Sequence, residues 1–323
     1  MPIDITTSTV RRLRKSKRRL KQPANIPEWK PPLQWEKDYM IYLTRNVNLW
    51  RDSCIQKVIP FLDDLVLSSQ VVRPPEASNI KSDSSGRVDG WVDQLERIMM
   101  EYEITLKELP TGPDWNFNAS QVGKGVDEWN KDQWYKISDS VLSVPLVQAN
   151  PWLSDTIQSF AKENVSLISK LQGNTVRDIE EVINRGIRQG KTAKTIEQEL
   201  LDGTDLQKGV FHKTETRARL IARDQVDKLN GQLTNLRQTE AGITQYRWRT
   251  AMDERVRKKH KSMSGKLCQW GNSTVYKNTP FPKEEWKLRS SIGGISLHPG
   301  QDYQCRCYAE PDFSTIVESL EDI

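Results

Sequence analysis

The chain contains 323 residues, of which 36% are hydrophobic and 28% are charged, and its mean hydropathy is −0.69. This composition excludes fibrous proteins and predicts a soluble protein of two domains. No apolar run reaches the roughly 20 residues that a membrane helix needs, and the N-terminus lacks the apolar stretch of a signal peptide. We therefore expect a cytoplasmic protein without a membrane partner, whose four cysteines are reduced thiols or metal ligands.

Basic residues concentrate in two regions of the sequence. Residues 11–21 hold eight lysines and arginines and no acidic residue, whereas residues 246–307 hold thirteen basic residues against five acidic ones. Because the net charge is only +5, the rest of the chain is mildly acidic. This asymmetry predicts a polyanionic partner. The side chains expected to contact nucleic acid are those of Arg11, Arg12, Arg14, Lys15, Lys17, Arg18, Arg19, Lys21, Arg255, Arg257, Lys258 and Lys259.

The N-terminal half divides into an arm and a helical region. In residues 1–32 the basic run is followed by four prolines, which interrupt helices, so we expect a flexible arm. Such an arm either binds a partner or is a solvated tail. Residues 33–150 are expected to form a variable, mainly helical region, with helices over 33–70 and 91–109. Proline and glycine residues predict a loop over 71–90 and a further loop that contains Gly112, Pro113, Gly123 and Gly125.

Residues 151–240 show the clearest helical periodicity. We expect one helix to end before Gly173 and a second to follow it. A short helix is predicted to begin at Thr192 or Thr195, because either hydroxyl can cap it. A long helix is expected over 213–240, where leucine, isoleucine and valine residues form one apolar stripe.

Residues 241–323 are expected to form a separate small domain. The segment ITQYRWR at 243–249 alternates apolar and polar residues, which is typical of a half-buried strand. A short helix is predicted to begin at Asp253 and to end at Gly265. The expected fold class is therefore α+β, with a mostly helical N-terminal and middle region followed by a small C-terminal α+β domain.

Five of the chain's seven histidines and cysteines fall between positions 260 and 307. Imidazole and thiolate groups are the ligands that Zn²⁺ prefers, and a small loop-rich domain gains much stability from such an ion. Two cysteines two positions apart on a strand share one face, which suits joint ligation but equally suits two buried thiols. The predicted ligands of a structural zinc ion are His260, His298, Cys305 and Cys307, with Cys268 as a substitute.

The same region also raises the question of catalysis. Arg257 and His260 lie three residues apart, and with Asp253 they could perform acid–base chemistry on a phosphodiester. However, the sequence contains no metalloprotease, serine-hydrolase or phosphate-loop motif, and no dispersed carboxylates suited to two metal ions. We therefore expect no enzymatic activity. A structural cluster of ion pairs, or a basic face against DNA phosphates, suits these residues better.

Several short motifs occur in a fixed order over residues 150–310. A helix with the sequence LIARDQVDKLNGQ precedes the block D-x-R-V-R-x-x-H, which is followed by H-P and by C-R-C. In this order the motifs resemble those of the Mu protein F-like minor head proteins of tailed bacteriophages. The family often has Asn before C-R-C, where this chain has Gln304. The residues that carry the resemblance are Trp248, Asp253, Arg255, Arg257, His260, Gly265, His298, Pro299, Cys305, Arg306 and Cys307.

The resemblance implies a structural protein present in few copies per phage head. Such a protein enters during procapsid assembly, associates with the portal and acts in DNA packaging or ejection. The implied partners are the portal protein, the major capsid or scaffolding protein and double-stranded phage DNA. The implied location is inside the virion head near the portal, and the host cytoplasm during assembly. Some family members carry an additional toxin domain, which we do not expect in the sixteen residues after Cys307.

Two alternatives from other functional classes stay open at this point. The first is a metal-dependent nuclease or toxin-like enzyme built on the C-terminal domain, which would require activity that depends on His260 or Asp253. The second is a host nucleic-acid-binding protein that uses the two basic regions.

Deleting residues 11–21 is expected to weaken binding to non-specific double-stranded DNA and to flatten its salt dependence. Fewer phosphate contacts release fewer counterions, so the slope of log affinity against log salt becomes shallower. Fluorescence anisotropy titrations between about 50 and 200 mM salt measure this slope, and circular dichroism checks that the fold is intact. An unchanged slope would exclude the arm from DNA contact.

Overall fold

The computed structural model describes most of the chain, which forms two compact units, each assembled from segments that alternate along the sequence. Unit 1 combines Met1–Asp38, Ala119–Ala161 and Ala222–Ile323, and unit 2 combines Tyr39–Asn118 and Lys162–Ile221. Residues 1–25 of the predicted arm, Asp253, Arg255 and most of the predicted 71–90 loop lie outside the described residues, whereas Trp29, which was also predicted to lie in the flexible arm, is buried. The structure describes residues 26–70, 90–109, 112–142, 145–251, 256–278 and 284–314.

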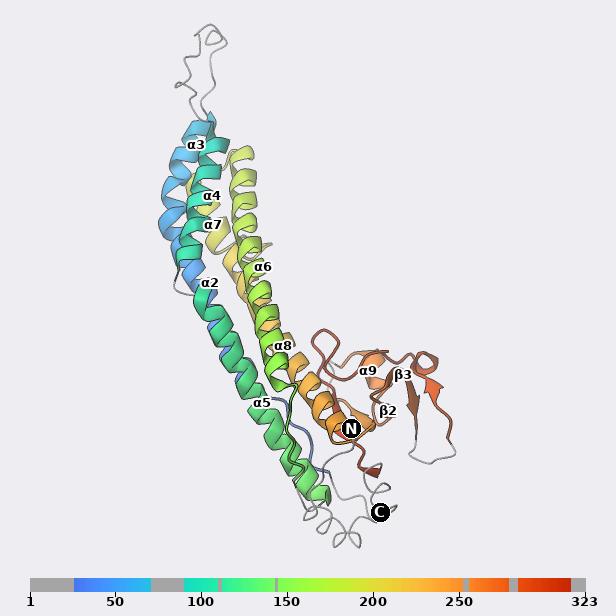
Figure 1. Ribbon diagram of the computed structural model, residues 1–323. Helices are drawn as coiled ribbons and strands as arrows, with labels where there is room; N and C mark the ends of the chain where they lie inside the picture. The colour runs from blue at the N-terminus through green and yellow to red at the C-terminus, as the bar shows by residue number, and fades with distance from the viewer. Residues whose placement is uncertain are drawn as a thin grey trace, which may run out of the picture. The chain divides into compact units, whose positions relative to one another are not determined.

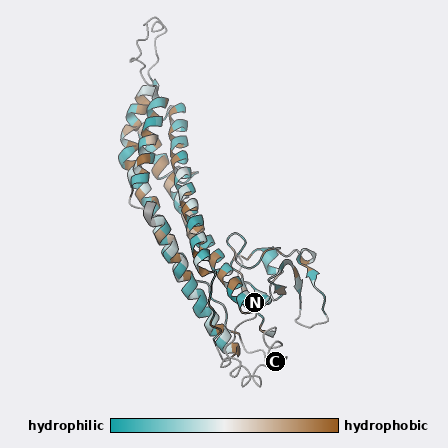
Figure 2. Cartoon of the chain, in the orientation of Figure 1, coloured by the Kyte–Doolittle hydropathy of each residue, from teal (hydrophilic) through white to brown (hydrophobic). Residues whose placement is uncertain are grey.

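Helices account for most of unit 2 and for a large part of unit 1 (Figure 1). Figure 2 shows that hydrophobic and hydrophilic stretches alternate along them, as expected for amphipathic helices with one buried face. None of the described helices combines the length and apolar character needed to cross a bilayer. In chain order the helices are α2 (Leu33–Lys57), the 3₁₀ helix η1 (Ile59–Phe61), α3 (Leu62–Gln70), α4 (Trp91–Glu108), α5 (Gly112–Leu142), α6 (Leu153–Arg188), α7 (Ala193–Leu201) and α8 (Val210–Glu240).

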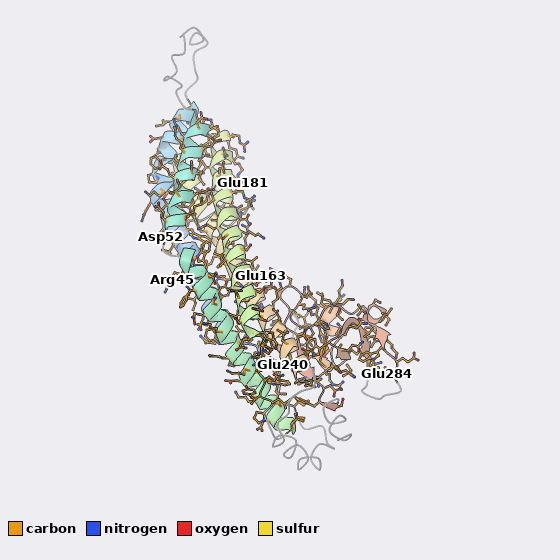
Figure 3. All side chains as sticks on the ribbon, in the orientation of Figure 1. Arg45, Asp52, Glu163, Glu181, Glu240 and Glu284 are labelled. Atoms are coloured by element: carbon orange, nitrogen blue, oxygen red, sulfur yellow. The ribbon has the colours of Figure 1, made fainter. Side chains whose placement is uncertain are left out.

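Unit 2 is a helical core in which the hydroxyl groups of two buried tyrosines are hydrogen-bonded. The Tyr39 hydroxyl donates to the Asn164 amide oxygen at 2.7 Å, and the Tyr102 hydroxyl donates to the Trp50 carbonyl at 2.8 Å. Tyr39, Tyr102 and Trp50 are fully buried. The two hydrogen bonds therefore avoid the free-energy cost of burying a hydroxyl group without a partner. Charged side chains such as Arg45 and Asp52 project from the helices into solvent (Figure 3).

In unit 1, a buried arginine links α5 to α8. Arg237 is 1% exposed, and its guanidinium pairs with the Asp127 carboxylate and donates to the Asn130 amide oxygen. Its guanidinium carbon also lies 5.6 Å from the centre of the Trp152 ring. Because a buried charge without its partner is strongly destabilising, this network fixes how the two helices pack.

Two predicted helix interruptions were wrong, and both were based on glycine. The expected loop containing Gly123 and Gly125 is part of α5, and Gly173 lies inside the continuous α6. At Gly125 an added Cβ would lie 2.0 Å from the Trp35 ring, so this glycine permits close packing rather than a turn. Gly173 faces open space, and α6 accommodates it at a cost of about 1 kcal/mol.

The predicted start of the short helix is confirmed. Thr192 is the N-cap of α7, and its side chain accepts a hydrogen bond from the Thr195 backbone N–H. The long helix α8 begins three residues earlier than predicted and ends at Glu240 as expected. Gly242 then takes a φ of +78°, which glycine adopts without strain.

The C-terminal part of unit 1 contains a five-stranded antiparallel sheet, so the predicted α+β class is confirmed. The predicted strand over 243–249 is observed as the first strand of the sheet, with Tyr246 and Trp248 buried. The strand order is β4-β3-β2-β1-β5. The elements are β1 (Gln245–Arg249), the short helix α9 (Lys258–Lys261), β2 (Leu267–Gln269), β3 (Asn272–Lys277), β4 (Lys287–Leu288), the 3₁₀ helix η3 (Arg289–Ile292) and β5 (Tyr308–Pro311).

The sheet and its loops are attached to the C-terminal half of α8 (Figure 1). The Gln238 side chain donates to the Ala309 carbonyl in β5 at 2.9 Å and accepts from the Trp270 indole N–H at 3.0 Å. Nearer the middle of α8, the Asp224 carboxylate accepts from the Gln304 backbone N–H at 2.7 Å. This helix therefore positions the loop that precedes β5.

Gly231→Ala is expected to destabilise unit 1 by about 1–3 kcal/mol. Its Cβ would lie 2.8 Å from the Pro299 carbonyl oxygen and 2.9 Å from the α-carbon of Gly300, which are backbone atoms that cannot rotate away. Urea unfolding measures the change. The matched control is Gly173→Ala in α6, which meets no neighbour and should stabilise the chain by up to about 1 kcal/mol. Equal effects at both glycines would contradict the close approach.

Candidate metal centre

A histidine and two cysteines converge in the C-terminal domain. His260 lies on α9, and Cys305 and Cys307 lie at the end of the loop that leads into β5. All three side chains are buried. The His260 Nδ1 atom lies 3.2 Å from the Cys307 sulfur and 3.6 Å from the Cys305 sulfur, and the three candidate ligand atoms are all within 4.8 Å of one another. The sequence-predicted set thus contributes three ligands from two separate segments.

An acidic residue that the sequence analysis missed orients the histidine. The Asp302 Oδ2 atom lies 2.9 Å from His260 Nε2, on the side of the ring opposite the cysteines. Arg257 holds this carboxylate at 2.8 Å and also donates to the Tyr303 carbonyl at 2.6 Å. When Nε2 donates its proton to Asp302, the Nδ1 lone pair is left facing the two sulfurs, which is the arrangement that metal-binding histidines use.

The two thiols share a hydrogen bond that makes one of them acidic. The hydrogen bond from Cys307 lowers the pKa of Cys305 to about 5, against the opposing effect of burial, and a further bond from His260 assists. The same interaction raises the pKa of Cys307. Burial alone would lower the pKa of His260, but hydrogen bonds with Cys305 and Asp302 raise it overall. The cluster therefore favours the thiolate form of Cys305, with Cys307 as the donor of the hydrogen bond.

The donor set and its spacing fit zinc. One imidazole nitrogen and two sulfurs match the ligand types of Cys/His zinc sites, in which neighbouring ligand atoms lie about 3.5–3.8 Å apart. The observed separations of 3.2 and 3.6 Å are close to this range. Calcium and magnesium prefer oxygen ligands and fit the cluster poorly.

The structure does not bring His298 into this group. Its Nδ1 atom lies 2.8 Å from the Tyr246 hydroxyl, and its ring centre lies 5.0 Å from the centre of the Trp270 ring. The proposed substitute Cys268 is also buried elsewhere in the sheet and belongs to the same aromatic cluster as Tyr246. Burial lowers the pKa of His298 to about 4, and Arg289 adds to this effect, so the ring is neutral at pH 7.

Arg289 is a second important residue that the sequence analysis missed. It is fully buried and donates to the carbonyl oxygens of Val275, Ile295 and Leu297 and to the Tyr246 hydroxyl. A single side chain thus bonds the carbonyls of two loop residues and of one residue of β3. No sequence motif marks this role, because its partners are mostly backbone atoms in segments without regular structure.

The remaining motif residues within the described chain build the domain. Trp248 is buried with its ring edge-on to His260, the centres being 5.9 Å apart. Gly265 takes a φ of +76° in the turn before β2. The short helix was predicted to begin at Asp253, but the observed helix α9 follows an N-cap at Arg257. Pro299 lies against α8 at Gly231.

The residues predicted to bind nucleic acid differ in their exposure to solvent and in whether they already bind other groups of the chain. Arg257 is partly exposed but is already engaged with Asp302 and Tyr303. Lys258 and Lys259 are exposed on α9. The remaining predicted residues, Arg255 and the arm, are outside the described chain, so DNA contact stays a prediction.

His298→Gln is expected to make the stability of the domain less sensitive to mild acid. In the unfolded chain this histidine takes up a proton near pH 6.5, whereas in the folded chain it stays neutral down to about pH 4. Its contribution to stability is therefore complete above pH 6.5 and is lost as the pH falls toward 4. Urea unfolding in EDTA at about pH 7 and about pH 5 measures the difference.

The control for this experiment is His212→Gln. His212 is exposed on α8, so its replacement should leave the acid sensitivity of the wild type unchanged. If His298→Gln were as sensitive to acid as the wild type, the lowered pKa of His298 would not be the cause of the acid sensitivity.

Comparison with known proteins places this region in a family. Residues 177–310 match the family model described as Phage Mu protein F like protein. An uncharacterized protein of Haemophilus influenzae is 24% identical over 274 residues, which cover 84% of this chain and 54% of that protein, so the chain spans about half the length of this relative. No solved structure matches the chain. Residues 177–310, which are less than half of the chain, are thus similar to the Mu protein F-like family.

Proposed function

We propose that the chain is a minor head protein of a tailed phage that enters the procapsid at the portal and contacts packaged DNA without sequence specificity. The observation that carries the proposal is the family match over residues 177–310, which covers α7, α8, the sheet and the His–Cys cluster. The exposed lysines of α9 and the basic residues 11–21 support DNA contact through phosphates.

The way in which the motif residues are used supports a structural role. Trp248, His260, Cys305 and Cys307 are buried and contact one another, and Arg257 holds the carboxylate that orients the histidine. Catalytic groups need access to a substrate, whereas these side chains join α9 to the loop before β5. The motif therefore specifies how the domain is built.

We further propose that His260, Cys305 and Cys307 supply three of the four ligands of a zinc ion that stabilises the domain. Such an ion would tie α9 to the start of β5 in a domain whose strands are only two to six residues long. Zinc binding needs both thiols deprotonated, and the acidic Cys305 supplies one thiolate at pH 7. Asp302 would act on His260 and not on the ion.

Elemental analysis of the purified chain is expected to find about one zinc per chain. Cys307→Ser and His260→Asn should lose the zinc and lower the melting temperature of the domain, whereas the matched control Cys268→Ser should retain the zinc. Asp302→Asn should keep the site but weaken zinc affinity about 10–100-fold, measured by competition with a chelator. Metal-free protein with an unchanged melting temperature in EDTA would refute the zinc site.

The head-protein proposal is tested in virions of a phage that carries the gene. Mass spectrometry of purified heads should detect the chain at a few copies per particle, and it should co-purify with the portal protein from assembling procapsids. Detection only in the soluble fraction of infected cells, and never in heads, would refute the proposal.

The enzymatic alternative has its own test. Zinc-loaded protein is incubated with plasmid DNA and with RNA, and we expect no cleavage. Cleavage that disappears in His260→Asn would instead establish the nuclease.

A further inference from the structure

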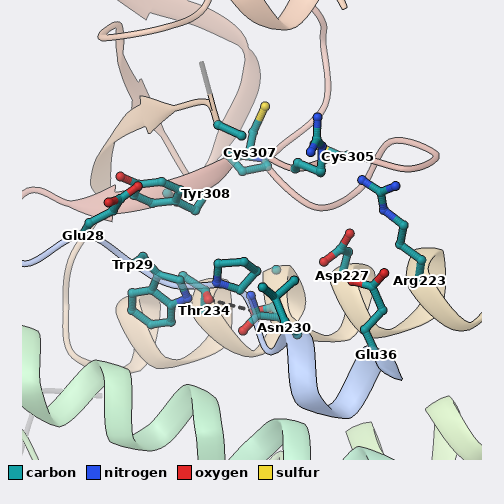
Figure 4. Close-up of a pocket in the computed structure, with 17 residues that line it drawn as sticks. Glu28, Trp29, Glu36, Arg223, Asp227, Asn230, Thr234, Cys305, Cys307 and Tyr308 are labelled. Atoms are coloured by element: carbon teal, nitrogen blue, oxygen red, sulfur yellow. Dashed lines mark hydrogen bonds between the residues drawn. The ribbon is translucent and has the colours of Figure 1, made fainter. Parts of the chain in front are cut away.

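Unit 1 contains a cavity of about 380 Å³ between the residues that lead into α2, one face of α8 and the segment 305–309 (Figure 4). A water molecule occupies about 30 Å³ in the liquid, so the cavity has room for roughly a dozen waters or a ligand of similar size. It lies next to the proposed metal centre, but Figure 4 shows the Cys307 sulfur directed away from its interior. Cys305 and Cys307 both line the cavity, so it borders the proposed metal centre.

Two carboxylates face each other at one end of this cavity. Glu36 projects from α2 and Asp227 from α8 (Figure 4). Within the part of the chain that the structure describes, no ion pair or hydrogen bond reaches either carboxylate. Burial raises the pKa of Asp227 to about 8, and the nearby Glu36 charge adds to this effect. The fold thus keeps a pair of acidic groups together, and Arg223, which lies near both, forms no ion pair with either.

Apolar side chains form much of the remaining wall, which Asn230 and Thr234 also border. Pro31, Pro299 and Ala309 contribute aliphatic surface, and Trp29 adds an aromatic ring. Figure 4 shows a third carboxylate, Glu28, beside Tyr308 on the side opposite Asp227. A ligand that fits this distribution has a cationic group at each end and a hydrocarbon chain between them.

Arg223 and Arg306 also line the cavity, so the alternative of an anionic ligand has to be weighed. Three carboxylates outnumber these two arginines. Arg223 lies near enough to Glu36 and Asp227 to lower the pKa of both, yet it forms no ion pair within 4.0 Å with either. A phosphate bound by Arg223 would lie close to both carboxylates and be repelled by them. A cation is therefore favoured.

We propose that this cavity binds an aliphatic diamine, with one ammonium group between Glu36 and Asp227, the carbon chain along the proline-lined wall and the other ammonium group at Glu28. Each ammonium group would donate charge-assisted hydrogen bonds, which are stronger than bonds between neutral groups. The inference does not depend on the head-protein function or on zinc.

Isothermal titration calorimetry of the full chain with cadaverine tests the proposal. At about pH 8.5 both carboxylates are largely ionised while the amine is still protonated. Saturable binding is expected, with n-pentylamine weaker than cadaverine and 1-pentanol much weaker than both, because these probes carry one and no ammonium group. Equal binding of pentanol would show that the cavity only accepts hydrocarbon and would overturn the proposal.

Variants of the cavity sharpen this test. Asp227→Asn should weaken cadaverine binding at least about tenfold, the loss expected for a charge-assisted bond. Glu28→Gln should weaken cadaverine about threefold, as for an exposed ion pair, without affecting pentylamine. Arg223→Gln should strengthen cadaverine binding because it removes a repelling cation. Glu128→Gln, an exposed change on α5, serves as the matched control and should change nothing.

Three other results would overturn the proposal. The first is an absence of saturable cadaverine binding to the folded wild type. The second is cadaverine binding that Asp227→Asn leaves unchanged. The third is binding of inorganic phosphate that Arg223→Gln abolishes, which would make the cavity an anion site. Because Arg223→Gln and Asp227→Asn are expected to act in opposite directions, general loss of folding cannot mimic the expected pattern.

Discussion

The contact between α8 and the loop before β5 determines the arrangement of the C-terminal domain. Gly231 lets the backbone of Pro299 and Gly300 approach α8 closely, and Asp224 then holds the Gln304 backbone N–H. These two contacts lie on either side of the segment that carries Asp302 and lead directly into the cysteines. The chemistry of the His–Cys cluster therefore depends on helix packing, because no regular sheet pairing holds this described loop in place.

In unit 1, two buried arginine side chains form hydrogen bonds to many of the buried polar groups around them. Arg289 donates to three backbone carbonyls and one hydroxyl, and Arg237 joins Asp127 and Asn130 on α5. A small unit with short strands has many backbone groups without sheet partners, and buried guanidinium groups with five donors are suited to satisfy them. Such networks favour one packing arrangement, since every alternative leaves a charge unpaired.

The sequence correctly predicted structural features that depend on residues near one another in the chain. It did not predict features that depend on contacts between residues far apart in sequence. The alternation at 245–249 and the Thr192 cap are local, and both were found. Gly125 was predicted to lie in a loop, because the Trp35 ring that requires a glycine at this position lies about ninety residues away in sequence. Spacing placed His260, Cys305 and Cys307 in one group but could not tell that His298 packs against Tyr246. Asp302 carries no motif at all.

The two outer strands of the sheet limit how copies of this chain can associate. On one side β4 is only two residues long and includes Lys287, and on the other β5 ends at Pro311, which has no backbone N–H to donate. Short, charged or proline-bearing edges resist the addition of a strand from another molecule. At the high local concentration of a crowded compartment, the described sheet would resist growing into intermolecular ribbons, and specific assembly would be left to side chains and helix surfaces.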